Sequence, residues 1–525
     1  MKKYYAIVLL CFSLLGCASV RFRGTPIVVN TREALETQLS PQQKNQWALL
    51  DIQQDAIPGM SVQRAYNELI KNKTGEKVIV AIIDSGMDID HPALSPNIWI
   101  NEDEIPNNNV DDDQNGYIDD RHGWNFLGDS ENENYEYVRL QKHEDPDSEA
   151  FARFEEKRQK ERIKYKNRMG NVLFLKEQIP IARQRLQKAL GKEDFSIDEA
   201  EALSPISVEL SEAIRLMQYV DELGITEEDL TAAMKQYQDA LDYHHNLDFE
   251  GRSLVGDDPD NFDDQKYGDP HVRGPKEADI DHGTHVGGIV GGRASTNGAM
   301  GIAKNVAIMP IRAVPNGDEY DKDIALAIRY AVDNGAKVIN ASFGKSYSAH
   351  PEWVLEAIKY AEAHDVLIVH AAGNDNENVD PGMAPNFPND YVDGREVCDN
   401  LITVGASTWD YNQSLVAYFS NFGPVNVDVF APGYQIFSTV PNGEYDHFDG
   451  TSMAAPNVSG VAAVLRSFYP KYSAKTIKKI ILASGVPMYY QLDRPDSDEQ
   501  ENPTFFAHTG KIVNLYNALL TASKQ

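Results

Sequence analysis

Two histidines three residues apart, His282 and His285, lie in the stretch DIDHGTHVGGIVGG. Residues three apart on a helix share roughly one face, so the two imidazoles could bind one metal ion. A zinc site would need a third cysteine, histidine or carboxylate nearby, and zinc-binding histidines on a helix usually stand four apart. The spacing leaves three interpretations open: a metal site, a structural pair, or one catalytic base beside a supporting histidine.

Two other positions could act together with a histidine. Asp84 ends the hydrophobic run IVAIID, and functional side chains of open α/β sheets collect at the carboxyl ends of strands. Ser452 lies in FDGTSMAAP, where a Gly–Thr–Ser turn enters a helix pattern of small residues. The free N–H groups and the dipole of a helix N-terminus favour negative charge beside that hydroxyl. The simpler alternatives are an aspartate that caps a turn and a serine that caps the helix.

Four motifs, in chain order DSGMDIDHP, HGTHVGGIVGG, AAGN and GTSMAAP, resemble the signature regions of the subtilisin-like serine peptidases, or subtilases. The order Asp…His…Ser agrees with that of subtilisin. The resemblance covers residues 46–125 and 255–525. It implies an α/β, subtilisin-like three-layer fold, with a mostly parallel sheet and helices on both faces.

The resemblance also implies a role for each matching residue. Ser452 would be the nucleophile, His282 the base that accepts its proton, and Asp84 the group that orients the imidazole. Asn374 of AAGN would donate its side-chain amide to the oxyanion, beside the Ser452 backbone N–H. His285 would be a hydrogen-bonded packing residue that faces the sheet, which favours the interpretation of one base beside a supporting histidine.

Substrate contacts follow from the same resemblance. NASFGK is similar to the segment with which the family pairs the substrate backbone as an added strand. Small residues of AAGN would form the opposite wall of the pocket for the residue before the scissile bond. The expected substrate-binding residues are Ser342, Phe343, Gly344, Ala371, Ala372 and Gly373. The base of this pocket has no signature in the sequence, so cleavage specificity stays open.

The elements that must position these residues are visible as alternating patterns. Apolar runs rich in β-branched residues recur at 77–86, 305–314, 336–344, 366–374 and 401–407, with amphipathic helical patterns between several of them. Strand–helix alternation predicts a parallel sheet with helices on both faces.

Residues 131–254 interrupt that alternation with helical patterns and form a predicted all-helical insertion. Thr226 and Asp229 are spaced as a capping box. Apolar residues at helical spacing form two stripes: Leu210, Ile214, Met217 and Val220, and Leu230, Met234, Tyr237 and Leu241. We expect the stripes to pack within the insertion, and a docking face for a partner is the alternative. Because both ends of the insertion lie near Asp84 and His282 in the chain, the insertion could also gate the cleft.

The acidic loop VDDDQNGYIDD has the oxygen-ligand spacing used for calcium. Position twelve is His122 rather than the glutamate of an EF-hand, so Asp119 or Asp120 would have to complete the ligand shell. The predicted ligands of a structural calcium ion are Asp111, Asp113, Asn115, Tyr117, Asp119 and Asp120. A solvated acidic loop is the alternative.

The first residues predict export. Lys2 and Lys3 precede a short apolar run, and LLGC, ending at Cys17, resembles a bacterial lipobox. We therefore expect a signal peptide over 1–16, a lipidated Cys17, a tether over 17–45, and a place in the bacterial cell envelope. Ordinary signal cleavage is the alternative. The chain has three cysteines, and only Cys398 would remain unmodified, so no intramolecular disulfide is expected.

The expected protein is thus an exported, lipid-anchored serine endopeptidase, with a peptidase domain over 46–130 and 255–525. Its net charge of −31 excludes nucleic acid as a partner, since phosphate binding needs a basic face. Protein or peptide substrates are expected. Two rival functions remain: a binding or scaffolding protein on a retired protease fold, and a processing or peptide-ligating enzyme with the same triad.

Overall fold

A nine-stranded sheet forms the centre of the protein. The computed structural model describes residues 20–29, 38–204, 207–275, 279–295, 297–494 and 499–525. The strand order is β12-β15-β9-β8-β5-β4-β1-β3-β2. The strands are β1 Val78–Asp84, β2 Trp124–Asn125, β3 Val306–Arg312, β4 Val338–Ala341, β5 Leu367–Ala371, β8 Leu401–Ser407, β9 Val429–Pro432, β12 Val486–Pro487 and β15 Lys511–Ile512. Only β12 pairs antiparallel with its neighbour, which confirms the predicted mostly parallel sheet.

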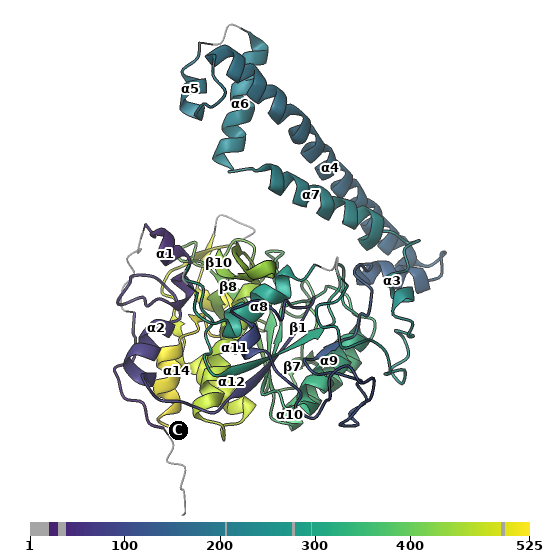
Figure 1. The fold of residues 1–525 in the computed structure, drawn as a ribbon, viewed down its shortest axis with the longest axis vertical. Coiled ribbons are helices and arrows are strands. Elements are labelled where there is room, and N and C mark those ends of the chain that lie inside the picture. Colours follow the sequence, from purple (N-terminus) through teal and green to yellow (C-terminus); the bar gives the residue numbers. More distant parts are fainter. Residues whose placement is uncertain (1–19, 30–37, 205–206, 276–278, 296, 495–498) are drawn as a thin grey trace, which may run out of the picture.

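Helices cover both faces of the sheet, as predicted (Figure 1). Successive side chains of a strand point to opposite faces. In β1, Val80 and Ile82 belong to one hydrophobic core, whereas Ala81 and Ile83 belong to the other. The first core lies under α8 Asp281–Gly291, α11 Thr451–Phe468, α12 Ala474–Ser484 and α14 Leu515–Ala522; the second lies under α9 Asp321–Asp333 and α10 Pro351–Ala363.

A two-stranded hairpin outside the main sheet fixes helix α8. Strand β10 Ile436–Val440 pairs antiparallel with β11 Glu444–Phe448. The hydroxyls of Ser438 and Thr439 donate to the carbonyl oxygens of His285 and Thr284, each at 2.8 Å. Because α8 is held by the hairpin as well as by the sheet, the orientation of its first turn is set from two sides.

The helical insertion projects from the body as an arm (Figure 1). It comprises α3 Glu136–His143, α4 Glu149–Leu190, α5 Ile197–Glu201, α6 Val208–Glu222, α7 Glu227–Asp239 and the π-helical turn Ala240–His244. Of the residues predicted to pack within it, Ile214, Met217, Val220 and Leu230 are buried. Thr226 and Asp229 form the predicted capping box. The arm therefore has a small hydrophobic core of its own, which includes Leu186 of α4.

The segment before the peptidase domain differs from the expectation. Over residues 20–29 the predicted tether packs against the body, where Phe22, Ile27 and Val29 are buried. The backbone N–H and C=O of Ile27 bond to the side-chain amide of Asn517 at 2.8 and 3.0 Å. These apolar side chains, in a stretch that otherwise looks polar, explain why the segment docks. Cys17 lies outside the described residues.

The remaining α-helices and strands are short: α1 Pro41–Lys44, α2 Val62–Arg64, β6 Tyr391–Val392, β7 Arg395–Glu396, β13 Leu492–Asp493, β14 Gln500–Glu501 and α13 Pro503–Phe506. Among the residues that the structure describes, no helix has both the length and the apolar character needed to cross a bilayer.

Candidate active site

Asp84 and His282 meet at the carboxyl end of β1. Asp84 Oδ1 lies 2.7 Å from His282 Nδ1, so this nitrogen carries the proton that the carboxylate accepts. Asp84 is 2% exposed, whereas the His282 side chain is 39% exposed. A side chain at Gly283 would lie 2.1 Å from the Gly86 carbonyl oxygen and 3.1 Å from Asp84 Cβ. Glycine after the histidine is therefore what lets α8 approach the end of β1.

His285 lies one turn further along α8 and has different surroundings. Its Nε2 is 3.1 Å from the Asp446 carbonyl oxygen, and its ring stacks on Phe448 with centroids 4.3 Å apart. Burial lowers its pKa to about 3, so the imidazole is neutral. It is the hydrogen-bonded packing residue that was expected, but it faces the β10–β11 hairpin rather than the main sheet, because that hairpin covers this side of α8.

Ser452 stands in the first turn of α11, and Ser342 follows β4. The Ser452 hydroxyl donates to the Ser342 carbonyl oxygen at 3.2 Å, and the Ser342 hydroxyl donates to the Ser452 carbonyl oxygen at 2.8 Å. Pro456 has no N–H, so it leaves the Ser452 carbonyl without its helical donor and free for Ser342. We call Ser342, Phe343 and Gly344 the substrate-edge segment. In this arrangement the hydroxyl of Ser452, the candidate nucleophile, bonds to this segment and not to His282. Hydrogen bonds of catalytic groups are often long or misaligned until substrate is bound.

Asn374 faces the same helix N-terminus from the loop after β5. Its Oδ1 accepts from the Thr451 backbone N–H at 2.8 Å and from the Thr451 hydroxyl at 3.0 Å. A backbone N–H can only donate, so the atom facing it must be the amide oxygen, and Nδ2 donates to no acceptor among the described residues. A methyl group built on Gly450, where φ is +151°, would lie 3.5 Å from Ser452 N and 3.6 Å from Asn374 Nδ2. The Ser452 and Asn374 nitrogens thus lie near one point beside the serine, and Asn374 Oδ1 is 3.7 Å from the same point.

The six expected substrate residues lie on two neighbouring segments, after β4 and at the end of β5. Ser342 and Phe343 are buried, and their carbonyl oxygens already accept from Ser452 and from His370 Nε2. Gly344 is exposed, and in the described chain its N–H and C=O take part in no hydrogen bond. Asn386 braces the second wall by donating to the carbonyl oxygens of Ala372 and Ala371, at 3.0 and 3.3 Å. The N–H and C=O of Gly344 are therefore available to pair with the backbone of a substrate.

The acidic loop brings together only part of the predicted calcium set. Glu104, Asp111 and Asp113 each offer a carboxylate oxygen within 4.8 Å of the others, and no other such group of three occurs among the described residues. Asp119 instead accepts from the backbone N–H groups of Asn108 and Asn109. Asp120 is buried and bonded to Tyr330 OH at 2.7 Å.

Two further predicted ligands, Tyr117 and Asn115, have other side-chain contacts, and a tyrosine at this loop position would offer its backbone carbonyl oxygen to calcium. The ring of Tyr117 packs edge-on against Trp124 and Tyr330, so its side chain is part of a hydrophobic cluster. The Asn115 amide nitrogen faces Asp113 Oδ2 at 3.1 Å. Glu104 was missed because it precedes Asp111 by seven residues and no spacing rule includes it.

Comparison with known proteins identifies the class. Residues 75–505 match the Subtilase family, and the chain belongs to that family. It is 40% identical over 233 residues to the thermophilic serine proteinase of Bacillus sp. (strain AK1), covering 43% of this chain and 50% of that protein. It is 34% identical over 214 residues to subtilisin DY of Bacillus licheniformis, covering 40% of this chain and 73% of that protein. The chain thus spans only half the length of the first of these relatives.

Among the solved structures that the chain matches is one of proteases from Pseudoalteromonas arctica PAMC 21717. The match has a TM-score of 0.37 and 27% identity, over 47% of this chain and 73% of that one.

Thr451 and Lys345 are site residues that motif reasoning missed. Thr451 orients Asn374, and its hydroxyl also accepts from the Gly373 N–H at 3.0 Å. Lys345 follows Gly344 and is buried. Thr451 lies inside the GTSMAAP motif, whereas nothing in the sequence marks Lys345 as buried.

The charge of Asp84 controls the titration of His282. Burial disfavours the imidazolium, but the Asp84 charge and hydrogen bond outweigh burial and raise the pKa of His282. Because the folded pKa exceeds the ordinary value of about 6.5, this interaction stabilises the fold fully below that pH. The contribution is lost as the pH rises through the folded pKa.

We predict that Asp84→Asn lowers the pKa of His282, because the opposing burial remains after the charge is gone. NMR titration of the ¹⁵N-labelled imidazole measures it. Asp90→Asn, at an exposed aspartate six residues along, is the matched control. An unchanged or higher pKa in Asp84→Asn would show that the carboxylate does not govern this imidazole.

Proposed function

We propose that this chain is a serine endopeptidase that cleaves peptide bonds through an acyl-enzyme. The observation that carries the proposal is the convergence on one edge of the sheet: the Asp84–His282 pair, Ser452 at a helix N-terminus, and the nitrogens of Ser452 and Asn374 around one space. The named proteinases among the relatives support it.

The reaction would begin with the Ser452 hydroxyl turning from the Ser342 carbonyl toward His282. Its oxygen attacks the substrate carbonyl carbon while Nε2 of His282 takes the proton. The oxyanion accepts from the Ser452 N–H and from Asn374 Nδ2. The C–N bond then breaks, the leaving amine takes the proton from His282, and the acyl group stays on Ser452. Water deprotonated by His282 releases the acid and restores the hydroxyl.

Fluorophosphonate labelling separates this function from its rivals. We expect the wild type to be labelled and Ser452→Ala to be unlabelled, with Ser346→Ala, at an exposed serine of the same edge, as the control. Asn374→Ala should lower kcat about 10²–10³-fold with little change in KM, a magnitude adopted from the corresponding donor of subtilisin. Labelling that does not depend on Ser452 would favour the binding or scaffolding function.

Profiling a peptide library distinguishes the enzymatic alternatives, since one cleaved motif favours processing and broad cleavage favours degradation. The same enzyme tested on a short peptide and on a folded protein also reports whether the insertion gates the cleft.

A cavity of about 240 Å³ supports the proposal that the insertion narrows the approach to the site. Ser85, next to Asp84, lies on its wall with Lys235, Asp239 and Tyr243 of the arm. Asn316 of the body donates to Asp239 at 3.1 Å, which joins the two walls. We infer that a substrate passing this side of Asp84 contacts the arm.

A structural calcium ion at Glu104, Asp111 and Asp113 is a further part of the proposal. Glu104 Oε1 accepts from the backbone N–H groups of Asp112 and Asp113, whereas its buried Oε2 has no hydrogen-bond partner. Burial, with the nearby acids, raises the pKa of Glu104. A hard oxygen-binding cation would satisfy the orphaned oxygen and offset the repulsion among the three acids. It would stabilise the loop and take no part in the peptide-bond chemistry.

Calcium removal should therefore lower the thermal stability. At free calcium 100 times its Kd, bound ion stabilises by about 2.7 kcal/mol, so chelation should lower Tm in calorimetry. Glu104→Gln should abolish this dependence, and Glu102→Gln, an exposed neighbour, should retain it. A chelation shift of equal size in wild type and Glu104→Gln would place the ion elsewhere.

We further propose export and a lipid anchor at Cys17, in the envelope of a bacterium. The lipobox-like LLGC after a basic and apolar leader supports it. Cells grown with a labelled fatty acid should yield labelled wild type and unlabelled Cys17→Ala, with Cys398→Ala as control. Equal labelling of all three proteins would exclude Cys17 as the acceptor.

A further inference from the structure

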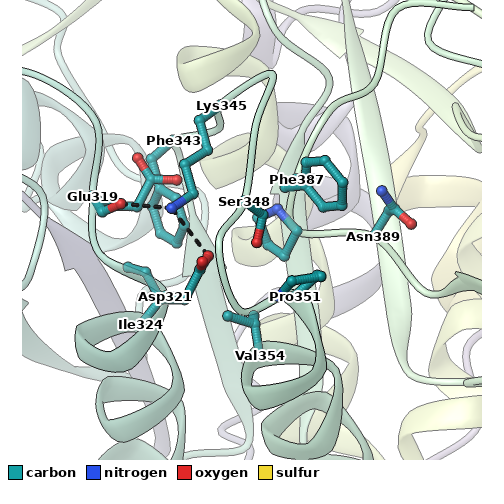
Figure 2. Close-up of a pocket in the computed structure, with 11 residues that line it drawn as sticks. Glu319, Asp321, Ile324, Phe343, Lys345, Ser348, Pro351, Val354, Phe387 and Asn389 are labelled. Carbon is teal, nitrogen blue, oxygen red and sulfur yellow. Dashed lines mark hydrogen bonds and ion pairs between the residues drawn. The ribbon is translucent and has the colours of Figure 1, made fainter. Parts of the chain in front are cut away.

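Lys345 is a buried cation directly after the free backbone edge at Gly344. Its side chain is 2% exposed. Its Nζ donates to Glu136 Oε2 at 2.8 Å and to the Glu319 carbonyl oxygen at 2.8 Å, and pairs with Asp321 Oδ1 at 3.0 Å. Figure 2 shows the ammonium between Glu319 and Asp321, with Phe343 beside it. The three acceptors use all three protons of the ammonium group.

One of those acceptors comes from the helical insertion. Glu136 is the first residue of α3, at the root of the arm, and its side chain is 4% exposed. Burial alone would raise its pKa, but the charges of Arg139 and Lys345 outweigh burial and lower it to about 2. Glu136 is therefore an anion at neutral pH. Burial raises the pKa of Glu319, and Lys345 bonds to its backbone carbonyl oxygen rather than to its carboxyl group.

Arg139 ties the same helix to the segment that faces Lys345. Its guanidinium pairs with Glu136 and donates to the carbonyl oxygens of Asp318 and Glu319, at 2.7 and 2.9 Å. It also lies 4.0 Å from the Tyr320 ring centroid. The Glu319 carbonyl oxygen thus accepts from both Arg139 and Lys345, and the root of the insertion and the substrate-edge segment share one buried network.

The backbone of Lys345 is held on its other side. Its N–H and C=O bond to Phe387 at 3.1 and 2.9 Å, which uses its backbone donor and acceptor. The conformation at Gly344 is therefore constrained by where Lys345 is held. A buried ammonium that loses a counter-charge pays a large desolvation penalty and shifts toward water. Loss of Glu136 would remove one of the two carboxylates that pair with the Lys345 ammonium and would shift the side chain, which disturbs the adjoining edge at Gly344.

We propose that Glu136 is a positioning residue for substrate: through Lys345, the root of the insertion fixes the backbone edge at Gly344 that pairs with the peptide upstream of the scissile bond. The inference rests on the proposed peptidase function. It makes the root of the insertion an integral part of the substrate-binding groove, whatever the rest of the arm does.

Two substrates separate positioning from chemistry in the full-length enzyme. A tetrapeptide p-nitroanilide has backbone upstream of its scissile bond, whereas p-nitrophenyl acetate has none and depends on Ser452 and the oxyanion donors. In Glu136→Gln we expect kcat/KM for the peptide to fall about tenfold, roughly the value of one backbone hydrogen bond, mainly through KM. The kcat/KM for the ester should fall no more than in the control variant Glu149→Gln, which changes an exposed glutamate of α4.

Lys345→Met should lower the same peptide-to-ester ratio, and Glu136→Asp, which retains the charge, should restore part of it. A ratio in Glu136→Gln equal to that of Glu149→Gln would overturn the inference. So would an equal loss on both substrates that persists in Glu136→Asp, because Glu136 would then only hold the fold. A wild type that hydrolyses neither substrate, like Ser452→Ala, would overturn the proposed function and the inference with it.

Discussion

The hydrogen bond between Asp84 and His282 sets the constraint that organises this structure. It joins residues 198 positions apart in the chain at 2.7 Å. The sheet meets that constraint because β1 ends at Asp84, and because Gly283 lets α8 begin almost in contact with that end. The hairpin β10–β11 then holds α8 through the Ser438 and Thr439 hydroxyls. A side chain at position 283 would clash with the Gly86 carbonyl oxygen and would separate Asp84 from His282, even if the rest of the protein folded normally.

The position of Ser452 is fixed by a series of buried hydrogen bonds rather than by the Asp84–His282 pair. The Ser459 hydroxyl donates to Asn340 Oδ1 at 2.9 Å, and Asn340 Nδ2 donates to the Ser342 hydroxyl at 2.8 Å. That hydroxyl in turn bonds to the carbonyl that Pro456 leaves free. Fully satisfied buried networks of this kind hold one geometry, because breaking any link leaves a polar group unpaired in a medium of low dielectric. Helix α11 and strand β4 are therefore held in one relative position at Ser452.

The root of the insertion is joined to the body by buried charges and by apolar contacts such as that of Phe154 with Tyr347, and the arm has a small core of its own. Its small core around Leu186 lies within the arm, whereas its root is joined to the body by Glu136, Arg139 and Lys345. A buried ion pair favours one arrangement of its two partners. Any arrangement that separates them leaves a buried charge without a counter-charge, which is strongly destabilising. The arm can therefore extend from the body while its root stays fixed beside Gly344.

Much of the site was predictable from residue types and order. The motifs around Asp84, His282, Asn374 and Ser452 are contiguous, so local pattern and family resemblance were enough to name them. The parallel sheet followed from the strand–helix alternation, and the insertion followed from its helical stripes. The calcium ligands stay a prediction, and Asp119 and Asp120 have hydrogen-bond partners that no spacing rule includes.

Sequence by itself determined the fold class, the candidate site residues and the existence of a separate helical unit. These properties depend on the period of hydrophobic residues and on short motifs, both of which are local. Tertiary structure alone decided that His285 faces a hairpin, that residues 20–29 dock on Asn517, and that Lys345 is buried against the insertion. Each of these features depends on a contact between distant segments. The free energy of such a contact depends on both segments together, so neither segment alone predicts it.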